Sequence, residues 1–433
     1  MTTEPNRPEL DPQIADAVIN TPPGSAAPPA VPLVPGSAAA KVLGNGNSGA
    51  GAGSGAPGAV GGGGVWPQTV TGTPPPPEDR AVKRADAPDI LSRIDALIGE
   101  VAPGTTPESM QGRLVKDLIV NALKLVPDGR DTGEIKLITA AVKELRYAYR
   151  VFGQYAEPHK VTIFGSARTP KTHPDYAAAV EFGRLMAEAG WMSITGAGGG
   201  IMEAGHEGPG KEKSFGVAIR LPFETTANAV IAGDSKLITF RYFFTRKLMF
   251  ISQAEAVALF PGGFGTMDEA FESLTLIQTG KAAMLPVVLV QGKGETYWEQ
   301  FITFVKQGLL TRGWISEEDL SLFKLCQTPQ EAVDHILRFY RLYHSARYVK
   351  DDLVIRVKRP LHQRDIDRLS EKFGSLIKKP ENGGTTGGKI ILRGAFDAET
   401  DHKDLPRLVF THTRYHYGRI RQLIDAINEC EPA

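Results

Sequence analysis

The chain has 433 residues, with 49 Lys or Arg and 49 Asp or Glu, so its formal net charge at pH 7 is zero. This length allows two domains that each bury a hydrophobic core. The balanced charge argues against binding to a nucleic-acid polymer, because no excess of cations is available for a phosphate backbone. A small-molecule ligand is therefore favoured.

The N-terminal stretch MTTEPNRPEL has neither the charged nor the apolar region of a secretory signal. No apolar run approaches the roughly 18 residues that cross a bilayer. Cys326 and Cys430 are far apart and lack metal-ligand spacing, which is typical of free thiols in a reducing compartment. These features predict a cytoplasmic protein that does not enter a membrane.

Residues 21–77 consist mainly of Pro, Gly, Ala and Ser, and such a composition cannot bury enough apolar surface to offset the entropy lost on ordering. We interpret residues 1–85 as a disordered tail. Apolar residues then recur at steps of three and four between 135 and 152, which indicates one long amphipathic helix. Residues 86–155 are predicted to form a helical lead-in.

Short β-branched runs alternate with helical segments over residues 156–343. The runs cover residues 161–164, 192–195, 215–219, 236–240, 256–260 and 286–290. They are almost uniformly apolar, as expected of strands that are covered on both faces. The pattern predicts an α/β domain with a Rossmann-like, doubly wound parallel sheet, whose ligands bind beyond the carboxyl ends of the strands.

Residues 344–433 show a different pattern. DDLVIRVKRP, a helix over 362–377, KIILRGAF, RLVFTHT and a helix over 417–429 predict the order β-α-β-β-α, a small α+β accessory module. His412 and His416 are four residues apart, but no third ligand is evident. The sequence therefore predicts no metal site.

Three glycine-containing loops follow predicted strands: FGSAR at 164–168, TGAGGGIMEAG at 195–205 and PGGFGT at 261–266. The second fails the dinucleotide fingerprint G-x-G-x-x-G, because Ile201 occupies the last position when the count starts at Gly196. A further match, to the phosphate loop G-x-x-x-x-G-K, lacks the Ser or Thr that would bind magnesium and precedes a strand. We interpret that segment as a turn.

The PGGFGT loop is suited to binding one phosphate at a helix N-terminus, a geometry that needs no lysine. Gly262 and Gly263 let the backbone approach an anion, and Thr266 is predicted to cap the helix. A tight strand-to-helix turn without a ligand is the alternative. Glu269 is four residues beyond Gly265, on the same helix face and about 6 Å further along the axis, where a carboxylate would contact the ribose of a bound nucleotide.

At these positions the sequence resembles the LOG (Lonely Guy) family, long labelled lysine decarboxylases, whose hallmark PGGxGTxxE is complete at 261–269. RKLMF, with Arg246, Lys247 and Met249, is similar to the companion motif RKxxM. FGSAR, TGAGGGIMEAG and LPFETTAN also look like long bacterial members, and the resemblance covers residues 155–345. The family hydrolyses nucleoside 5′-monophosphates to free base and ribose 5-phosphate without metal or organic cofactor.

The resemblance implies that Arg246 and Glu269 are the catalytic pair. It implies that the phosphate is held by Gly262, Gly263, Gly265 and Thr266. Other substrate contacts are expected from Ser166, Arg168, Gly198, Gly199, Gly200, Glu203, Asn228 and Lys247. The extra N- and C-terminal segments resemble the long class that acts on purine or pyrimidine monophosphates, whereas compact members act on cytokinin riboside monophosphates.

The same resemblance implies a homo-oligomer, a dimer or larger. The alternative function is a non-catalytic carrier of a nucleotide or of the molybdenum cofactor, which would use the phosphate loop without turnover. A pyridoxal-dependent lysine decarboxylase is disfavoured, because no lysine is positioned for a Schiff base.

Overall fold

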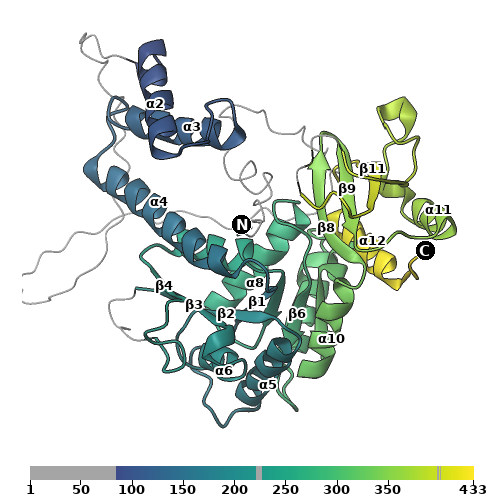
Figure 1. The fold of residues 1–433 in the computed structure, drawn as a ribbon. Coiled ribbons are helices and arrows are strands. Elements are labelled where there is room, and N and C mark those ends of the chain that lie inside the picture. Colours follow the sequence, from purple (N-terminus) through teal and green to yellow (C-terminus); the bar gives the residue numbers. More distant parts are fainter. Residues whose placement is uncertain (1–83, 221–226, 397–398, 400) are drawn as a thin grey trace, which may run out of the picture. The chain divides into compact units, whose positions relative to one another are not determined.

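The computed structural model of the protein describes residues 84–220, 227–396, 399 and 401–433 (Figure 1). All but two residues of the predicted tail lie outside these ranges. The chain forms two compact units that meet in sequence between Thr132 and Gly133. Among the described residues, no helix is both long enough and apolar enough to span a bilayer.

The helical lead-in is confirmed and is divided between the two units. The first unit contains α2 (Pro88–Val101) and α3 (Met110–Lys124), which share a small apolar cluster built on Ile94, Ile98 and Val120. The Ser109 side chain accepts a hydrogen bond from the Gly112 N–H and so caps α3. Helix α4 (Thr132–Phe152) lies almost wholly in the second unit and buries its last turn there.

The second unit contains a sheet of seven parallel strands in the order β4-β3-β2-β1-β5-β6-β7. The strands are β1 (Lys160–Phe164), β2 (Met192–Thr195), β3 (Ser214–Ile219), β4 (Leu237–Phe240), β5 (Ala256–Leu259), β6 (Val287–Val290) and β7 (Phe323–Cys326). The six predicted strands are all present. The edge strand β7 was not predicted, because FKLC is too short and too mixed to stand out in the sequence.

Helices cover both faces of this sheet, so the doubly wound fold is confirmed (Figure 1). Helices α5 (Pro174–Glu188), α6 (Ile201–Glu207) and α10 (Pro329–Phe339) pack on one face. The other face is covered by α4, α7 (Phe243–Ser252), α8 (Phe264–Gln278) and α9 (Tyr297–Phe304). Shorter helical segments are Gly153–Tyr155, Lys211–Lys213, Val305–Leu310, Glu317–Leu322, Gly374–Leu376 and Pro380–Asn382.

The strand order creates a switch point between β1 and β5. From β1 the chain proceeds outward through β2, β3 and β4, and it then returns to place β5 on the other side of β1. The loops that follow β1 and β5 therefore diverge and leave a crevice at the carboxyl edge of the sheet. The Ser166 N–H donates a 3.0 Å hydrogen bond to the Pro261 carbonyl, which joins the starts of these two loops.

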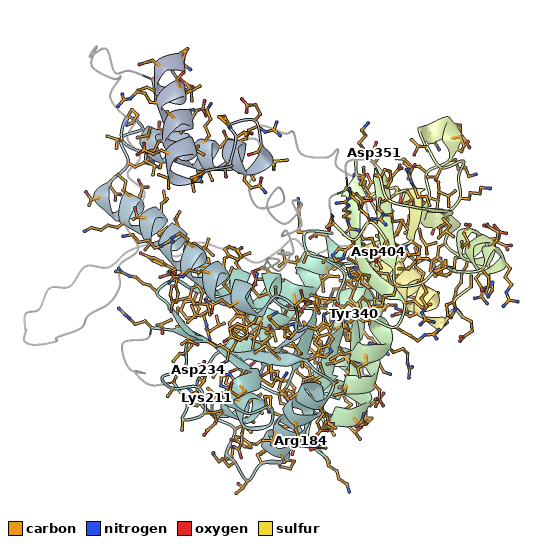
Figure 2. The ribbon with its side chains drawn as sticks, in the orientation of Figure 1. Arg184, Lys211, Asp234, Tyr340, Asp351 and Asp404 are labelled. Atoms are coloured by element: carbon orange, nitrogen blue, oxygen red, sulfur yellow. The ribbon has the colours of Figure 1, made fainter. Side chains whose placement is uncertain are left out.

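The segment resembling a phosphate loop is a turn, as the sequence indicated. Its first glycine, Gly205, lies inside α6, and Lys211 begins a short helical turn directly before β3. The Lys211 Nζ lies 3.9 Å from the Asp234 carboxylate, and the two side chains are neighbours in Figure 2. Lys211 therefore has a local carboxylate partner.

The C-terminal module is an antiparallel sheet in the order β10-β11-β9-β8 with two helices. Its elements are β8 (Tyr343–Val349), β9 (Asp352–Val357), α11 (Gln363–Lys372), β10 (Ile391–Arg393), β11 (Arg407–Thr411) and α12 (Tyr417–Glu429). The predicted order β-α-β-β-α is therefore wrong by one strand. β8 was missed because YHSARYV has no apolar run, and this strand is stabilised by its pairing with β9.

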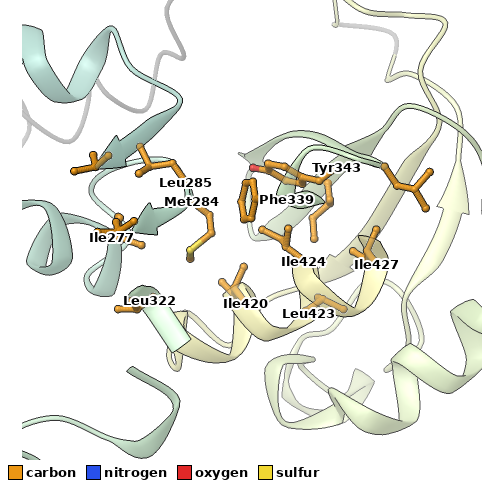
Figure 3. Packing of buried hydrophobic residues seen from close by; sticks show 14 of the residues in the cluster. Ile277, Met284, Leu285, Leu322, Phe339, Tyr343, Ile420, Leu423, Ile424 and Ile427 are labelled. Atoms are coloured by element: carbon orange, nitrogen blue, oxygen red, sulfur yellow. The ribbon is translucent and has the colours of Figure 1, made fainter. Parts of the chain in front are cut away.

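Apolar side chains join the C-terminal module to the parallel-sheet domain in one continuous core (Figure 3). Ile277 at the end of α8 and Met284 and Leu285 before β6 lie on one side. Ile420 and Ile424 of α12 lie on the other, together with Phe339 and Tyr343. Because this core is shared, the module is an integral part of the second unit.

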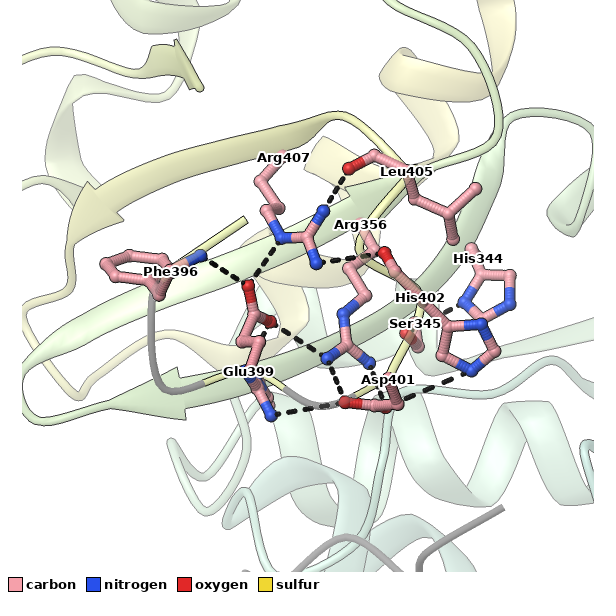
Figure 4. A network of polar contacts seen from close by, with 10 residues as sticks. His344, Ser345, Arg356, Phe396, Glu399, Asp401, His402, Leu405 and Arg407 are labelled. Atoms are coloured by element: carbon pink, nitrogen blue, oxygen red, sulfur yellow. Dashed lines mark hydrogen bonds and ion pairs between the residues drawn. The ribbon is translucent and has the colours of Figure 1, made fainter. Parts of the chain in front are cut away.

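A buried ionic network lies within the module (Figure 4). The Glu399 carboxylate lies 2.8 Å from the Arg407 Nε and 2.9 Å from an Arg356 Nη, and Arg356 also pairs with Asp401 at 3.0 Å. Burial opposes ionisation of Glu399, but the Phe396 N–H and the guanidinium groups outweigh it and lower its pKa to about 2. Glu399 is therefore ionised and fastens its loop to β9 and β11.

The two histidines weighed as metal ligands have separate partners. His412 is buried between the Tyr348 hydroxyl and the Tyr415 carbonyl, at 2.7 and 3.1 Å. His416 pairs with Glu318 at 2.8 Å. The two side chains do not converge on one point.

Candidate functional site

A cleft of about 1610 Å³ lies at the carboxyl edge of the parallel sheet. It is lined by the loops that follow β1 to β5 and by the first turns of α7 and α8. The cleft includes the β1–β5 switch point, the place where open α/β sheets bind their ligands.

The PGGFGT loop forms one wall of the cleft. Gly262, Gly263, Gly265 and Thr266 all line it, and Gly263 is the N-cap residue of α8. The N-terminal amides of a 15-residue helix therefore face the cleft, and they offer hydrogen bonds and a positive dipole end to an anion. The predicted capping by Thr266 is wrong: Thr266 lies inside the first turn of α8, and none of the described side chains caps this helix.

The loop is held by close backbone contacts. The Tyr297 hydroxyl donates a 2.5 Å hydrogen bond to the Gly262 carbonyl. A Cβ at Gly262 would collide with the Thr266 side chain and would lie only 2.9 Å from the Ser166 backbone nitrogen. Glycine at this position therefore allows the β1 and β5 loops to pack directly against each other.

Of the other predicted contact residues, in the loops 164–168 and 195–205 and at Asn228, some line the cleft and others do not. Ser166, Arg168 and Gly198 line the cleft. Gly199, Gly200, Glu203 and Asn228 are not among its lining residues. Gly200 has a φ of 59° and packs against the Ser166 carbonyl, so it shapes the β1 loop from behind.

Glu203 and Asn228 have structural partners outside the cleft. Glu203 pairs with Lys171 at 3.0 Å. The Asn228 side-chain amide donates a 3.0 Å hydrogen bond to the Gly198 carbonyl and also contacts the buried His206 ring. Asn228 therefore supports the glycine loop, and its neighbour Ala227 is the residue that faces the cleft.

Glu269 is a buried carboxylate in the cleft wall. Its side chain is only 8% exposed, and its Oε2 has no hydrogen-bond partner among the described residues. Burial raises the pKa of Glu269 to about 7, while the charges of Lys247 and Arg246 oppose this shift. At neutral pH this group exchanges a proton readily, as a general acid or base must.

Arg246 of α7 lines the same cleft. Its Nε donates a 2.8 Å hydrogen bond to the Val217 carbonyl of β3, and its guanidinium carbon lies 5.0 Å from the centre of the Phe250 ring. These contacts place the guanidinium across the ends of β2 and β3. The similarity to RKxxM is incomplete, because the fifth position is Phe250 and Met249 precedes it; both side chains are buried in the core.

Residues 198–336 match the protein family described as "possible lysine decarboxylase", and the match includes the PGGFGTMDE segment and Arg246. The chain contains a LOG family domain. Over 100 residues it is 33% identical to a probable cytokinin riboside 5′-monophosphate phosphoribohydrolase from Oryza sativa subsp. japonica. This stretch is 23% of the chain and spans 45% of the length of that curated relative.

Two solved structures also align with part of the chain. A molybdenum cofactor binding protein from Rippkaea orientalis is 21% identical, with a TM-score of 0.29 over 42% of this chain and 95% of its own. The molybdenum cofactor carrier protein of Chlamydomonas reinhardtii is 19% identical, with a TM-score of 0.30 over 42% of this chain and 98% of its own.

Lys247 is not among the residues that line the cleft, and it forms ion pairs with two residues of α8, the helix that contains Glu269. Its Nζ is 2.8 Å from an Asp268 carboxylate oxygen and 2.7 Å from a Glu272 oxygen. Asp268 precedes Glu269, and Glu272 is one turn further along α8. Lys247 therefore pairs with both carboxylates that flank Glu269 and offsets part of their negative charge.

The cleft residues that sequence reasoning missed include Tyr297, Arg220 and Arg241. Arg220 and Arg241 directly follow β3 and β4, so their positions immediately after predicted strands were the available signal. Tyr297 belongs to α9 and carried no motif. Tyr297 reaches the Gly262 carbonyl because β6, which precedes α9, lies beside β5 in the sheet. A single sequence does not reveal that these two strands are neighbours.

Proposed function

We propose that the LOG domain hydrolyses the N-glycosidic bond of nucleoside 5′-monophosphates and releases free base and ribose 5-phosphate. One observation carries this proposal. A buried carboxylate with an unpartnered oxygen, Glu269, lies one turn into the helix whose N-terminal amides line the same cleft. The proposed anion-binding amides and a carboxyl group that can exchange a proton therefore lie a short distance apart on one helix.

The helix geometry fits a pentose 5-phosphate. A phosphate on the Gly263–Thr266 amides would be bound by the helix end, as anions commonly are. Each helical residue advances about 1.5 Å, so Glu269 lies about 6 Å beyond Gly265 on the same face. The ribose of the bound nucleotide would then be next to the Glu269 carboxylate.

In the proposed reaction, ionised Glu269 accepts a proton from water while the water oxygen bonds to C1′. The C1′–N bond breaks, its electron pair stays on the base, and the base is protonated from solvent. Positive charge that develops on the sugar is stabilised by the nearby carboxylate. Arg246 offers several donors to the departing base or the ribose hydroxyls. No metal or organic cofactor enters these steps.

The proposal is tested with purified full-length protein and a panel of AMP, GMP, CMP, UMP and a cytokinin riboside monophosphate. We expect free base from at least one monophosphate and much slower turnover of the matching nucleoside, which lacks the phosphate. Chromatography of base and ribose 5-phosphate measures both products. If every monophosphate remains intact while one binds tightly, the protein is a carrier and the proposed reaction is wrong.

The structure gives a reason to favour turnover over carriage. A carrier of an anionic ligand gains nothing from a buried carboxylate beside it, because desolvation and repulsion both weaken binding. Self-association into a homo-oligomer stays a prediction, which sedimentation analysis of the full chain would test.

Lys247 sets the pH dependence of the proposed reaction. Because Glu269 must be ionised, kcat/KM should rise with pH and level off above the Glu269 pKa of about 7. Lys247→Met removes a nearby positive charge and leaves Asp268 and Glu272 unpaired, so the midpoint should move up by roughly one pH unit. Glu272→Gln removes a negative neighbour instead and should move the midpoint down. If the midpoint of the kcat/KM profile is the same in wild type and both variants, a group other than Glu269 controls the pH dependence.

A further inference from the structure

The cleft of the LOG domain carries more positive charge than one phosphate monoester needs. Four arginines line it: Arg168, Arg220, Arg241 and Arg246. Among the described lining residues, the carboxylates are Asp268 and Glu269. Asp268 is paired with Lys247, which lies outside the cleft wall. An excess of positive charge therefore remains, in addition to the N-terminal dipole of α8.

Two of these arginines are remote from the phosphate loop. Arg220 directly follows β3 and Arg241 directly follows β4. In the sheet order, β3 and β4 are three and four strands away from β5, which leads into the phosphate loop. Neighbouring strands are about 4.8 Å apart, so the two arginines start roughly 14 and 19 Å from that loop. This separation is larger than one phosphate group.

Arg220 and Arg241 have exposed side chains without a charged partner among the described residues. Both residues are exposed, and within the described ranges neither guanidinium forms an ion pair. Glu144 of α4 is a carboxylate close to the Arg241 backbone. Its carboxylate already accepts hydrogen bonds from the Arg241 backbone N–H, at 2.8 Å, and from the Thr245 hydroxyl, at 2.7 Å. The Arg241 guanidinium instead lies 5.7 Å from the centre of the Tyr242 ring.

The volume of the cleft also indicates a ligand larger than a simple nucleoside monophosphate. Pockets for small ligands commonly measure roughly 300–1,000 Å³. The volume here is about 1610 Å³, so a nucleoside monophosphate on the phosphate loop leaves space toward β3 and β4. In the proposed orientation, with phosphate at α8 and ribose beside Glu269, the base would extend toward that space. A substituent on the base would reach Arg220 and Arg241.

We infer that Arg220 and Arg241 form a second anion site, which selects nucleoside 5′-monophosphates that carry an anionic group on the base. The orientation of the nucleotide rests on the proposed function. A ribose-borne phosphate has the same charge but lies near Glu269, so it does not reach this site. The inference therefore concerns the position of the second charge as well as its sign.

Binding is measured by calorimetry in the Glu269→Gln protein, so that turnover does not consume the ligand. The probes are AMP, N6-(1,2-dicarboxyethyl)-AMP, which has two carboxylates on the base, and adenosine 3′,5′-bisphosphate, whose second phosphate is on the ribose. We expect the base-carboxylated nucleotide to bind roughly tenfold tighter than AMP, as charge-assisted hydrogen bonds at an exposed site allow. The 3′,5′-bisphosphate should show no such gain.

The substitutions Arg220→Gln and Arg241→Gln are each introduced into the Glu269→Gln protein. Each should bring the affinity for the base-carboxylated nucleotide close to the affinity for AMP. Arg312→Gln, at an exposed arginine outside the cleft, should leave the ratio of these two affinities at its starting value. Equal binding of the first two probes, a ratio that persists in both cleft variants, or an equal gain for the bisphosphate would overturn the inference. The proposed function fails separately, if wild-type protein binds these ligands and releases no base.

Discussion

Glu269→Gln is expected to lower kcat for nucleoside monophosphate hydrolysis by about a thousandfold, within the range that general base catalysis contributes. The amide has nearly the shape of the carboxyl group, so the packing around α8 is preserved, but it accepts no proton from water. Nucleotide affinity should change only a few-fold, because the phosphate is bound by backbone amides. Steady-state rates and calorimetry measure the two effects. A variant that retains turnover would remove Glu269 from the mechanism.

The same variant gives a second result that does not depend on activity. In the folded protein the Glu269 pKa is about 7, against about 4.3 for an exposed glutamate. Below pH 4 Glu269 is protonated in the folded and in the unfolded protein, so its ionisation does not affect the unfolding free energy. Above pH 7 the folded protein must hold Glu269 as a buried charge, which lowers the unfolding free energy. The stability associated with Glu269 is therefore lost as pH rises through about 7.

Glu269→Gln should consequently raise the Tm at pH 8 and leave it unchanged at pH 4. The difference in unfolding free energy at pH 8 should be about 3–4 kcal/mol, since the pKa differs by about 2.7 units between the two states and one unit corresponds to about 1.4 kcal/mol. Glu212→Gln is the control, because it removes an exposed carboxylate outside the cleft and should leave the Tm unchanged. Equal Tm values for wild type and Glu269→Gln at pH 8 would contradict the raised pKa.

The parallel-sheet domain was predictable because the apolar runs and the loops that follow them both indicate buried parallel strands. Buried strands such as 161–164 and 256–260 are apolar throughout, and each is followed at once by a glycine-rich loop. Carboxyl ends of parallel strands share one edge, so the sequence already placed the β1, β2 and β5 loops together. The two missed strands, β7 and β8, lack this apolar signal and depend on pairing with a neighbouring strand.

The candidate site was less predictable where it depends on distances between segments. Lys247 and Glu203 are charged residues in recognisable motifs, yet both are paired behind the cleft wall. Arg241 lies in the wall because β4 ends beside β3, a relation that only the strand order gives. Thr266 was assigned as a cap because threonine commonly caps helices, but α8 begins earlier, at Phe264, and Gly263 is its N-cap residue.

Gly262→Ala is expected to damage both stability and nucleotide binding. The new Cβ would meet the Thr266 side chain and would lie 2.9 Å from the Ser166 nitrogen. The threonine could rotate, but the Ser166 backbone is fixed by its hydrogen bond to the Pro261 carbonyl. The β1 and β5 loops must therefore separate, at a cost of about 1–3 kcal/mol in unfolding free energy. The amides at the start of α8 would shift with them.

Because those amides form the proposed phosphate site, KM for the monophosphate should rise by about a hundredfold, as a loss of roughly 3 kcal/mol in binding implies. Gly265→Ala separates this effect from a general loss of helix stability. A Cβ at Gly265 has nothing within 4 Å, and alanine favours the helix, so the Tm of that variant should stay level or rise. If Gly262→Ala matched the wild-type Tm and KM, the close contact between the two loops would not be what positions the α8 amides.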